Sequence, residues 1–194
     1  MAVNLAAQTL VVDRGAPSAE TVPQAIERQG KGFLGDSFRL GTAGETWIID
    51  ALRVWAVASS SRACSLKPGG HLDNIALLGA LDNPPVPSQP ECACHALVEI
   101  AKAPGVQLTA GGLWQLDFQN LRWSVPGGLD ILYSVRAFPR PQAACGTWSL
   151  NASPAGSEYR LRRFDKDAIP EGFAESPGRP LWINVQVWAH RASQ

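Results

Sequence analysis

Glu45–Val57, with the sequence ETWIIDALRVWAV, is the stretch that decides the fold class of this chain. Its β-branched and aromatic residues are typical of a long strand, and its apolar positions form no helix-like stripe. Both faces of such a strand are largely apolar, so the pattern predicts a central strand that is covered on both sides. Asp50 and Arg53 interrupt those faces, and each of them therefore needs a polar partner.

Other strand patterns, separated by turn residues, fill the remainder of the chain. Leu113–Trp123 and Leu129–Phe138 alternate apolar and polar residues as half-buried strands do, and Leu181–Ala189 closes the chain in the same way. A helix is the alternative for Cys94–Lys102, and one helical turn is expected near Gln24–Arg28. Further strands are expected at Gln8–Asp13, Phe33–Leu40, Asp73–Leu81, Cys94–Lys102, Val106–Thr109, Thr147–Leu150 and Tyr159–Phe164.

Many short strands without a strand-helix alternation indicate an all-β fold, an antiparallel two-sheet β-sandwich. Long connections between the strands favour a jelly-roll-like topology. The 194 residues are 45% hydrophobic, which suits a single domain spanning 1–194 with a substantial core. The expected long loops are 59–72, 82–93, 139–158 and 165–180.

Charge and hydropathy exclude several classes of partner. The chain has 17 basic and 17 acidic residues and no basic stripe for nucleic acid or for an anionic membrane. No apolar run approaches the roughly 20 residues of a membrane-spanning helix. The start of the chain lacks the basic and continuous apolar segments of a signal peptide. The protein is therefore cytosolic, leaves the cell by another route, or has lost a leader.

Four cysteines, Cys64, Cys92, Cys94 and Cys145, form an even set in loop-like surroundings. Such a set favours disulfides in an oxidising compartment. A bond between Cys92 and Cys94 would close a small strained ring, so we expect Cys64 to pair with one of these two and Cys145 with the other. Free buried thiols are the alternative. A zinc site at Cys92, Cys94 and His95 fits the usual cysteine spacing poorly, and disulfides explain the same residues better.

Part of the chain resembles bacterial secreted β-sandwich domains that read Asp-Asp-Phe, a short turn, Trp-x-Ile-Asp and an aromatic strand. The runs that carry the resemblance are Gly35–Leu40, Gly44–Asp50 and Leu52–Trp55, and Leu108–Phe118 is similar to the second half of those domains. The resemblance covers about Gly35–Phe138. The chain differs in having Ser37 where a second Asp is common, and in lacking a C-terminal sorting segment. The resemblance implies a β-sandwich in an extracellular or cell-surface bacterial setting and says little about activity.

Carboxylates are candidate catalytic groups, because jelly rolls include glycan-cleaving enzymes and these enzymes use two facing acids. Asp165 and Asp167 have a same-face spacing, but the basic residues beside them indicate a solvated loop. Asp50 and Glu45 lie in the main strand without such a spacing. The chain also has no Gly-x-Ser-x-Gly elbow and no phosphate-binding glycine loop. We therefore expect no enzyme, with a glycoside hydrolase or lyase as the runner-up class.

No metal or cofactor site is predicted. The sequence holds no calcium-loop motif, although loop carboxylates such as Asp73 and Asp82 leave structural calcium as an option. His71 and His190 are isolated in the sequence and are expected to be ordinary surface or loop residues. Asn151 and Ser153 fit a glycosylation sequon, a triplet that often arises by chance.

The aromatic face of the last strand is the candidate ligand-binding site. Trp182 and Trp188 flank Asn184 and Gln186 on one side of that strand. Indole rings stack on sugar C–H groups while amides bind hydroxyls, so this pattern suits a carbohydrate-binding platform. Two alternatives remain: the strand is packed on both faces, or the face is a subunit contact.

Taken together, the sequence predicts a non-catalytic extracellular structural or adhesive β-sandwich. It would self-assemble as a homo-oligomer or dock to a larger surface complex through its sheet edges, with glycan as a further candidate partner. A carbohydrate-binding module is the alternative function, and a glycan-cleaving jelly-roll enzyme is the less favoured one.

Overall fold

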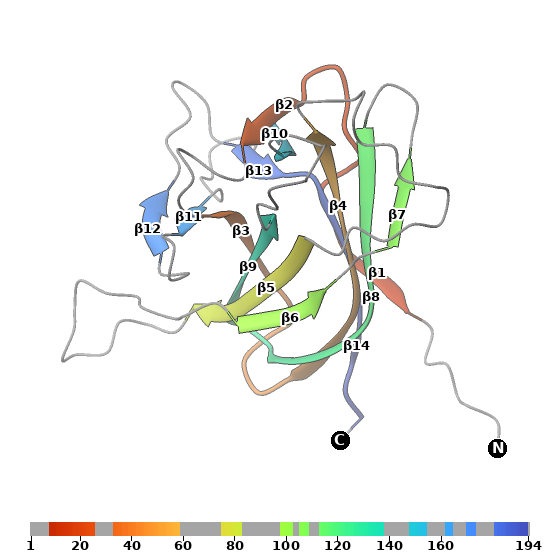
Figure 1. The fold of residues 1–194 in the computed structure, drawn as a ribbon. Helices are drawn as coiled ribbons and strands as arrows, with labels where there is room; N and C mark the ends of the chain where they lie inside the picture. The colour runs from red at the N-terminus through yellow and green to blue at the C-terminus, as the bar shows by residue number, and fades with distance from the viewer. Residues whose placement is uncertain are drawn as a thin grey trace.

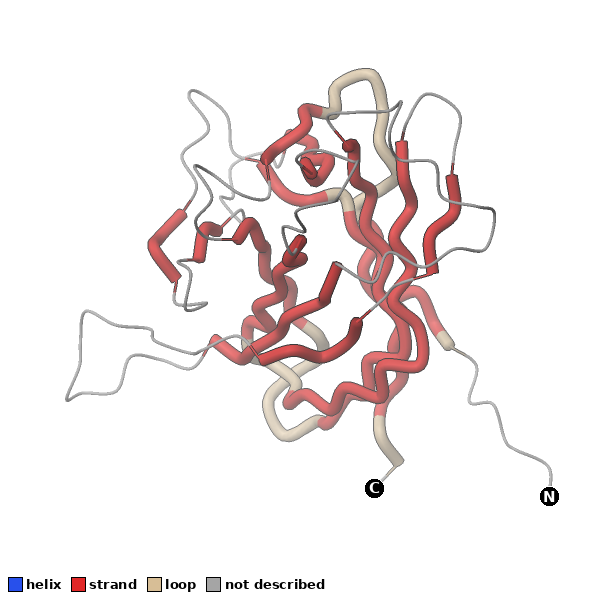
Figure 2. The backbone as a smooth tube through the Cα atoms, in the orientation of Figure 1, coloured by secondary structure: helices blue, strands red, loops and turns tan. Residues whose placement is uncertain are grey.

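A computed structural model gives two facing antiparallel sheets, which confirms the expected all-β sandwich. Figures 1 and 2 show the two layers. The structure describes residues 8–25, 33–58, 75–82, 98–102, 105–108, 113–137, 148–154, 162–164, 170–173 and 181–193. Within these ranges no residue is helical, so they contain no helix with the length and apolar character of a membrane span.

The larger sheet has eight strands, ordered β1-β14-β4-β10-β13, with β2 on β10 and with β8 between β4 and β7. These strands are β1 (Thr9–Asp13), β2 (Val22–Ala25), β4 (Thr46–Ala58), β7 (Gly105–Leu108), β8 (Leu113–Pro126), β10 (Trp148–Pro154), β13 (Leu181–Ile183) and β14 (Val185–Arg191). The central position of β4 agrees with the prediction for Glu45–Val57. One edge of β4 pairs with β8, and the other pairs with β14 and then with β10.

The smaller sheet has six strands in the order β12-β11-β3-β9-β5-β6. They are β3 (Phe33–Arg39), β5 (Ile75–Asp82), β6 (Val98–Lys102), β9 (Asp130–Ala137), β11 (Arg162–Phe164) and β12 (Pro170–Phe173). The chain changes sheet between β3 and β4, between β4 and β5, and at most later connections. This repeated crossing is the jelly-roll-like feature that the long connections predicted.

One face of β4 supplies the core, and the other face lies on the outside of the sandwich near Ala51 and Arg53, although Trp55 on that face is buried. Leu52, Val54 and Ala56 are fully buried, whereas Ala51 and Arg53 are partly exposed. The prediction that both faces are covered is therefore wrong for this part of the strand. The reason is that the outer face of the larger sheet carries no third layer in the described part of the chain.

A bulge in β4 changes which side chains face inward. In the pairing with β14, Ile49 and Ala51 lie opposite the consecutive residues Ala189 and Trp188, so Asp50 is an extra residue of β4. Ile49 and Leu52 therefore both point into the core although they are three residues apart. A strict two-residue alternation would place them on opposite faces. Asp50 sits at the bulge.

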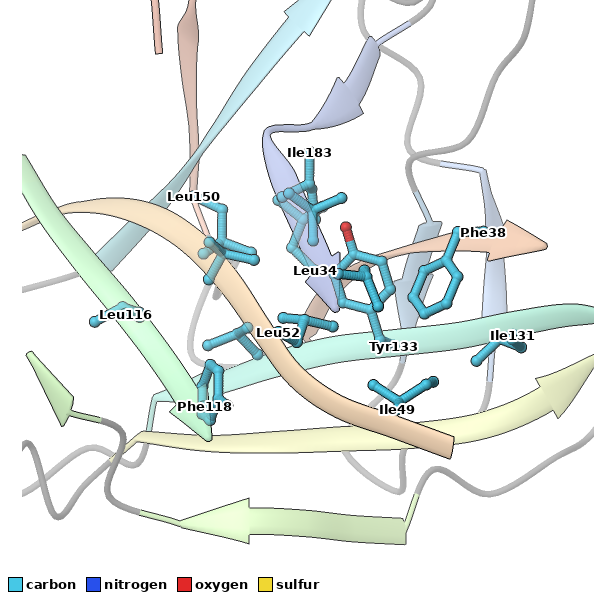
Figure 3. Packing of buried hydrophobic residues seen from close by; sticks show 14 of the residues in the cluster. Leu34, Phe38, Ile49, Leu52, Leu116, Phe118, Ile131, Tyr133, Leu150 and Ile183 are labelled. Atoms are coloured by element: carbon cyan, nitrogen blue, oxygen red, sulfur yellow. The ribbon is translucent and has the colours of Figure 1, made fainter. Parts of the chain in front are cut away.

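The core lies between the sheets and is built mainly from β3, β4, β8, β9 and β14. Phe38 and Tyr133 contact each other there, with ring centroids 5.6 Å apart (Figure 3). The largest fully buried side chains are Trp114, Tyr133, Phe38, Phe118, Leu34, Ile49, Leu52 and Leu116. The alternation predicted for Leu113–Trp123 is confirmed at Trp114, Leu116 and Phe118, which all face inward.

Several local predictions differ from the structure. A helical turn was expected at Gln24–Arg28, but its described residues, Gln24 and Ala25, belong to strand β2. The strand predicted at Cys94–Lys102 is confirmed over its described part, which is β6. Residues 131–135 of β9 are buried on both faces, whereas the alternation predicted a half-buried strand. The expected loops 139–158 and 165–180 contain strands β10 and β12. The expected final strand is two strands, β13 and β14.

Candidate functional site

The predicted platform on the last strand is divided in two at Asn184, where β13 ends and β14 begins. Asn184 is 1% exposed. Its side-chain nitrogen donates to the carbonyl oxygens of Arg14 and Gly15 at 3.1 and 3.2 Å, and its oxygen accepts from the Ser153 hydroxyl at 3.0 Å. The segment after β1 thus covers Asn184, which leaves it unavailable to a ligand on the outer face.

Trp182 lies on one side of this division and is covered by Arg14. The guanidinium carbon of Arg14 is 5.1 Å from the centre of the Trp182 ring, a cation–π contact. The Arg14 side chain is 9% exposed and forms an ion pair of 2.6 Å with Asp36, which is fully buried. One face of the Trp182 ring is therefore occupied by the Arg14 guanidinium, which the ion pair with Asp36 holds in place.

Asp36 joins the two sheets. It belongs to β3 of the smaller sheet, yet it accepts hydrogen bonds from Arg14 and from the Ile183 amide of the larger sheet, the latter at 2.7 Å. A further bond comes from the Ser37 amide at 2.6 Å, and Arg14 also donates to the Ser37 carbonyl. A buried carboxylate with this many donors is a structural connection.

Tyr133 lies close to this buried pair and is not a candidate catalytic base. Its ring is fully buried, and its hydroxyl has no hydrogen-bond partner among the described residues (Figure 3). Burial, and secondarily the negative charge of Asp36, raises the pKa of the Tyr133 hydroxyl well above its usual value of 10.0. The phenol therefore stays protonated at any physiological pH.

Trp188 lies on the other side of the division, beside a row of polar side chains that we call the polar row: Asp13, Gln186, Arg53 and Asp117. Each is directly opposite the next on strands β1, β14, β4 and β8. Gln186 donates to Asp13 at 3.2 Å and accepts from Arg53 at 3.4 Å. Arg53 donates to both carboxylate oxygens of Asp117, at 2.5 and 3.3 Å. The partner that the sequence required for Arg53 is thus Asp117.

A surface pocket of about 190 Å³ opens between Trp188 and β8. The guanidinium carbon of Arg53 is 5.1 Å from the centre of the Trp188 ring. Residues lining the pocket are Gln8, Ala51, Leu52, Arg53, Asp117, Phe118, Gln119, Asn120 and Trp188. An indole, an ion pair and several amides therefore surround one space on the outer face.

The wall of this pocket includes an irregular part of β8. Asn120 and Arg122 have positive φ angles of 56° and 50°, which non-glycine residues rarely adopt. They lie where the pairing of β8 with β4 is interrupted, opposite Asp50. Bulges and left-handed residues of this kind redirect side chains and are concentrated at functional sites.

Asp50 finds its expected partner in His190. The His190 Nδ1 atom is 2.7 Å from the Asp50 carboxylate, and both side chains are partly exposed. His190 therefore lies in strand β14 within ion-pairing distance of Asp50, whereas the sequence indicated an isolated surface or loop residue.

Several other predicted residues lie outside the described part of the chain. These are Cys64, Cys92, Cys94 and Cys145 of the expected disulfides, together with His71, Asp73, His95, Asp165 and Asp167. The backbone of Asp82 ends β5. Among the described residues, no group of three or more His, Cys, Asp or Glu side chains could hold a metal ion. Asn151 of the sequon is 3% exposed within β10, so a glycan cannot attach to it in the folded protein.

Sequence analysis identified Trp188 of the pocket and the neighbouring Gln186 of the polar row, but no other residue that lines the pocket as part of a site. Gln119 and Asn120 were placed only within a half-buried strand, and Gln8 only at the start of another. One signal in the sequence could have located Asp117. Arg53 needs an anionic partner, and Asp117 is an outward-facing acid on another long strand, which pairs with the strand of Arg53. The bulge that brings Asn120 into the pocket has no comparable signal.

Comparisons with known proteins identify no family: no family model and no curated protein matches this chain. Among solved structures, the chain is similar to the cysteine protease and lectin-like domains of Cwp84, a surface layer associated protein of Clostridium difficile. The identity is 10% and the TM-score 0.48, over 90% of this chain and 37% of that one. Cwp84 after propeptide cleavage gives 11% and 0.49, over 90% and 41%. The chain thus spans less than half the length of these proteins, and likeness at this level says nothing about activity.

Proposed function

We propose that this protein is a non-catalytic adhesive β-sandwich that binds carbohydrate through the pocket beside Trp188. The observation that carries the proposal is the composition of that pocket. An indole lies next to hydrogen-bonding amides and a charged pair on an open sheet face. Sugar rings present apolar C–H patches and many hydroxyls, and a site of this kind meets both requirements.

The acids of the described residues support binding without catalysis. Asp117 is the one carboxylate that lines the pocket, and it is held by Arg53 in a two-oxygen ion pair. Glycoside hydrolysis requires a second carboxyl group across the cleft. Asp50, the nearest acid in β4, is paired with His190.

An extracellular or cell-surface setting belongs to the same proposal. It is supported by the resemblance of Gly35–Phe138 to bacterial secreted β-sandwich domains and by the even set of four cysteines. Mass measurement of the chain before and after reduction tests the disulfide part. Four free thiols would contradict it.

Isothermal titration of the protein against a panel of oligosaccharides tests the binding function. We expect saturable binding to at least one glycan, and Trp188→Ala should weaken it about tenfold or more because the stacking surface is lost. Trp188→Phe should retain part of the affinity. Trp182→Leu is the matched control, because Trp182 is outside the pocket. Equal losses for Trp188→Ala and Trp182→Leu would contradict the assignment of the site.

Self-association is the second candidate function, and a specific feature favours it. Leu10 and Val22 are the large hydrophobic residues that the described part of the chain exposes, at 40% and 46%. Leu10 lies on β1, which is at an edge of the larger sheet. Sheet edges with exposed apolar groups are natural docking places for another strand. Light scattering over a range of concentrations should show an oligomer, and a monomer at every concentration would exclude this function.

A further inference from the structure

The charges in the pocket beside Trp188 cancel each other, and this affects the kind of sugar that can bind. Among the described residues that line the pocket, Arg53 is the one cation and Asp117 is the one anion. Arg53 gives two of its donors to Asp117 and a third to Gln186. The carboxylate in turn accepts a further hydrogen bond from Gln115, at 2.9 Å. The two charges are therefore compensated within the protein.

Free hydrogen-bonding capacity in the pocket resides instead in three carboxamides. Gln8, Gln119 and Asn120 line the pocket and are exposed, and their side chains form no hydrogen bond with any described residue. A carboxamide both donates and accepts, as a sugar hydroxyl does. Groups of this type recognise hydroxyls well, and they offer no charge to compensate a desolvated carboxylate.

Charges around the pocket do not alter this conclusion. Asp13 and Asp50 lie on the same outer face as the polar row, with His190 beside Asp50 and Arg122 exposed beyond Asn120. The polar row and these neighbours hold three carboxylates against two guanidinium groups and the imidazole of His190. The described part of this outer face therefore has no excess of positive charge to attract an anionic polymer.

We infer that the pocket is selective for neutral glycans over acidic ones, and that Gln119 and Asn120 determine this specificity by binding hydroxyl groups. This inference rests on the proposed function and narrows it to one class of carbohydrate. Arg53 acts in it as a positioning residue, because it holds the ring of Trp188 and the carboxylate of Asp117 in place.

Matched pairs of ligands test the inference on the full chain. Titrations would compare neutral oligosaccharides of glucose, mannose and galactose with the corresponding oligouronates. We expect the neutral member of a pair to bind about tenfold or more tightly, because the oligouronate loses its hydration without gaining a cation. If neither member of any pair binds, the proposed function fails together with the inference. Tighter binding of an oligouronate would overturn the inference alone.

Variants identify the groups that are responsible. Asn120→Gly removes the amide without adding strain, because glycine accepts the positive φ of this position. Asn120→Gly and Gln119→Ala should each weaken neutral binding about three- to tenfold. Ser124→Ala, an exposed position further along β8, is the control and should have no effect. Unchanged affinity in both amide variants would overturn their role.

Asp117→Asn provides a test with the opposite sign. The substitution keeps the side-chain shape but leaves the Arg53 guanidinium without its counter-charge. An oligouronate should then gain about tenfold or more in affinity relative to the neutral ligand, because a charge-assisted hydrogen bond becomes available. A neutral preference that is unchanged in Asp117→Asn would show that charge does not set the selectivity.

Discussion

Arg14 and Arg53 make the same contacts in two different surroundings. Each guanidinium group lies 5.1 Å from the centre of a tryptophan ring and forms an ion pair with an aspartate. The side chains of Arg14 and Asp36 are 9% and 0% exposed, whereas those of Arg53 and Asp117 are 28% and 16% exposed. One pair lies between the sheets, and the other borders a pocket on the outer face.

This difference in burial separates a structural role from a binding role. A buried ion pair has lost most of its hydration, so removal of one partner leaves an uncompensated charge in a medium of low polarity. A partly exposed pair is screened by water and contributes little to stability. The same three residue types, Arg, Trp and Asp, therefore connect the two sheets at Asp36 and border the proposed ligand site at Asp117.

The largest effect should come from breaking the buried pair. Asp36→Asn leaves the Arg14 guanidinium without a counter-charge, and we expect the free energy of unfolding to fall by about 3–5 kcal/mol. Urea denaturation measures it. The control is Arg39→Met. Arg39 lies in β3, the strand that also contains Asp36, and the substitution removes its ion pair with Asp130. Arg39 is 59% exposed, so this loss should be about 1 kcal/mol or less. Equal losses would contradict the structural role of Asp36.

The two tryptophans should divide stability and binding between them. Trp182→Leu removes the ring over the nearly buried Arg14, and we expect it to destabilise the fold by about 2 kcal/mol without changing glycan affinity. Trp188→Leu should do the reverse, with a stability loss of about 1 kcal/mol and a loss of binding. Denaturation and titration of the same two variants measure both quantities. Loss of glycan affinity in Trp182→Leu would contradict the assignment of a structural role to Trp182 and a binding role to Trp188.

Asp117→Ala tests the stability contribution of the partly exposed ion pair. Because the Arg53–Asp117 pair is partly solvated, we expect a stability loss of about 1 kcal/mol or less, far below that of Asp36→Asn. The loss should shrink in high salt, since water and ions screen this pair more than the buried one. Urea denaturation at low and high ionic strength measures this. A salt-independent loss of several kcal/mol would show that both pairs are structural.

The smallest effect concerns Glu45, a carboxylate nearer the surface. A hydrogen bond from the Thr42 amide, and then one from the Trp47 indole, lowers the pKa of Glu45 below its usual value of 4.5. A lowered folded-state pKa contributes stability above the unfolded pKa, and that contribution is lost as the pH falls through the folded value. Glu45→Gln should therefore be less stable than the parent at neutral pH, and the difference should disappear in acid. A constant difference across the pH range would contradict this.

The residue types and the apolar–polar alternation along the sequence were sufficient to predict the long strands and the sandwich. Glu45–Val57 and Leu113–Trp123 show their strand character in residue type and alternation, which neighbouring strands then support. The bulge at Asp50 could not be predicted, because Ile48 and Ile49 are both apolar and one extra residue leaves the pattern nearly unchanged. The bulge places Ile49 and Leu52 on the same face, where strict alternation would place them on opposite faces.

The buried pair escaped prediction for a different reason. Arg14 directly follows the expected strand Gln8–Asp13, where nothing in the sequence marks it as buried, and its partner is 22 positions further along the chain. Asp36 stood in the apolar run Phe33–Leu40, where a charge requires compensation, but the sequence does not say which cation supplies it. The break at Asn184 is also a long-range effect, since its amide binds backbone that is 170 positions earlier. The chain order alone shows Leu181–Ala189 as one continuous strand.

The contact between β1 and β14 has a consequence for how the protein is made. Asp13 and Gln186 are 173 positions apart and yet hydrogen-bonded, so a ribosome releases β1 long before β14 exists. During synthesis, the early strand has no neighbour on that side and its unpaired backbone stays available. Closure of this edge of the larger sheet therefore waits until β14 has been synthesised, and until then β1 is open to pairing with other strands.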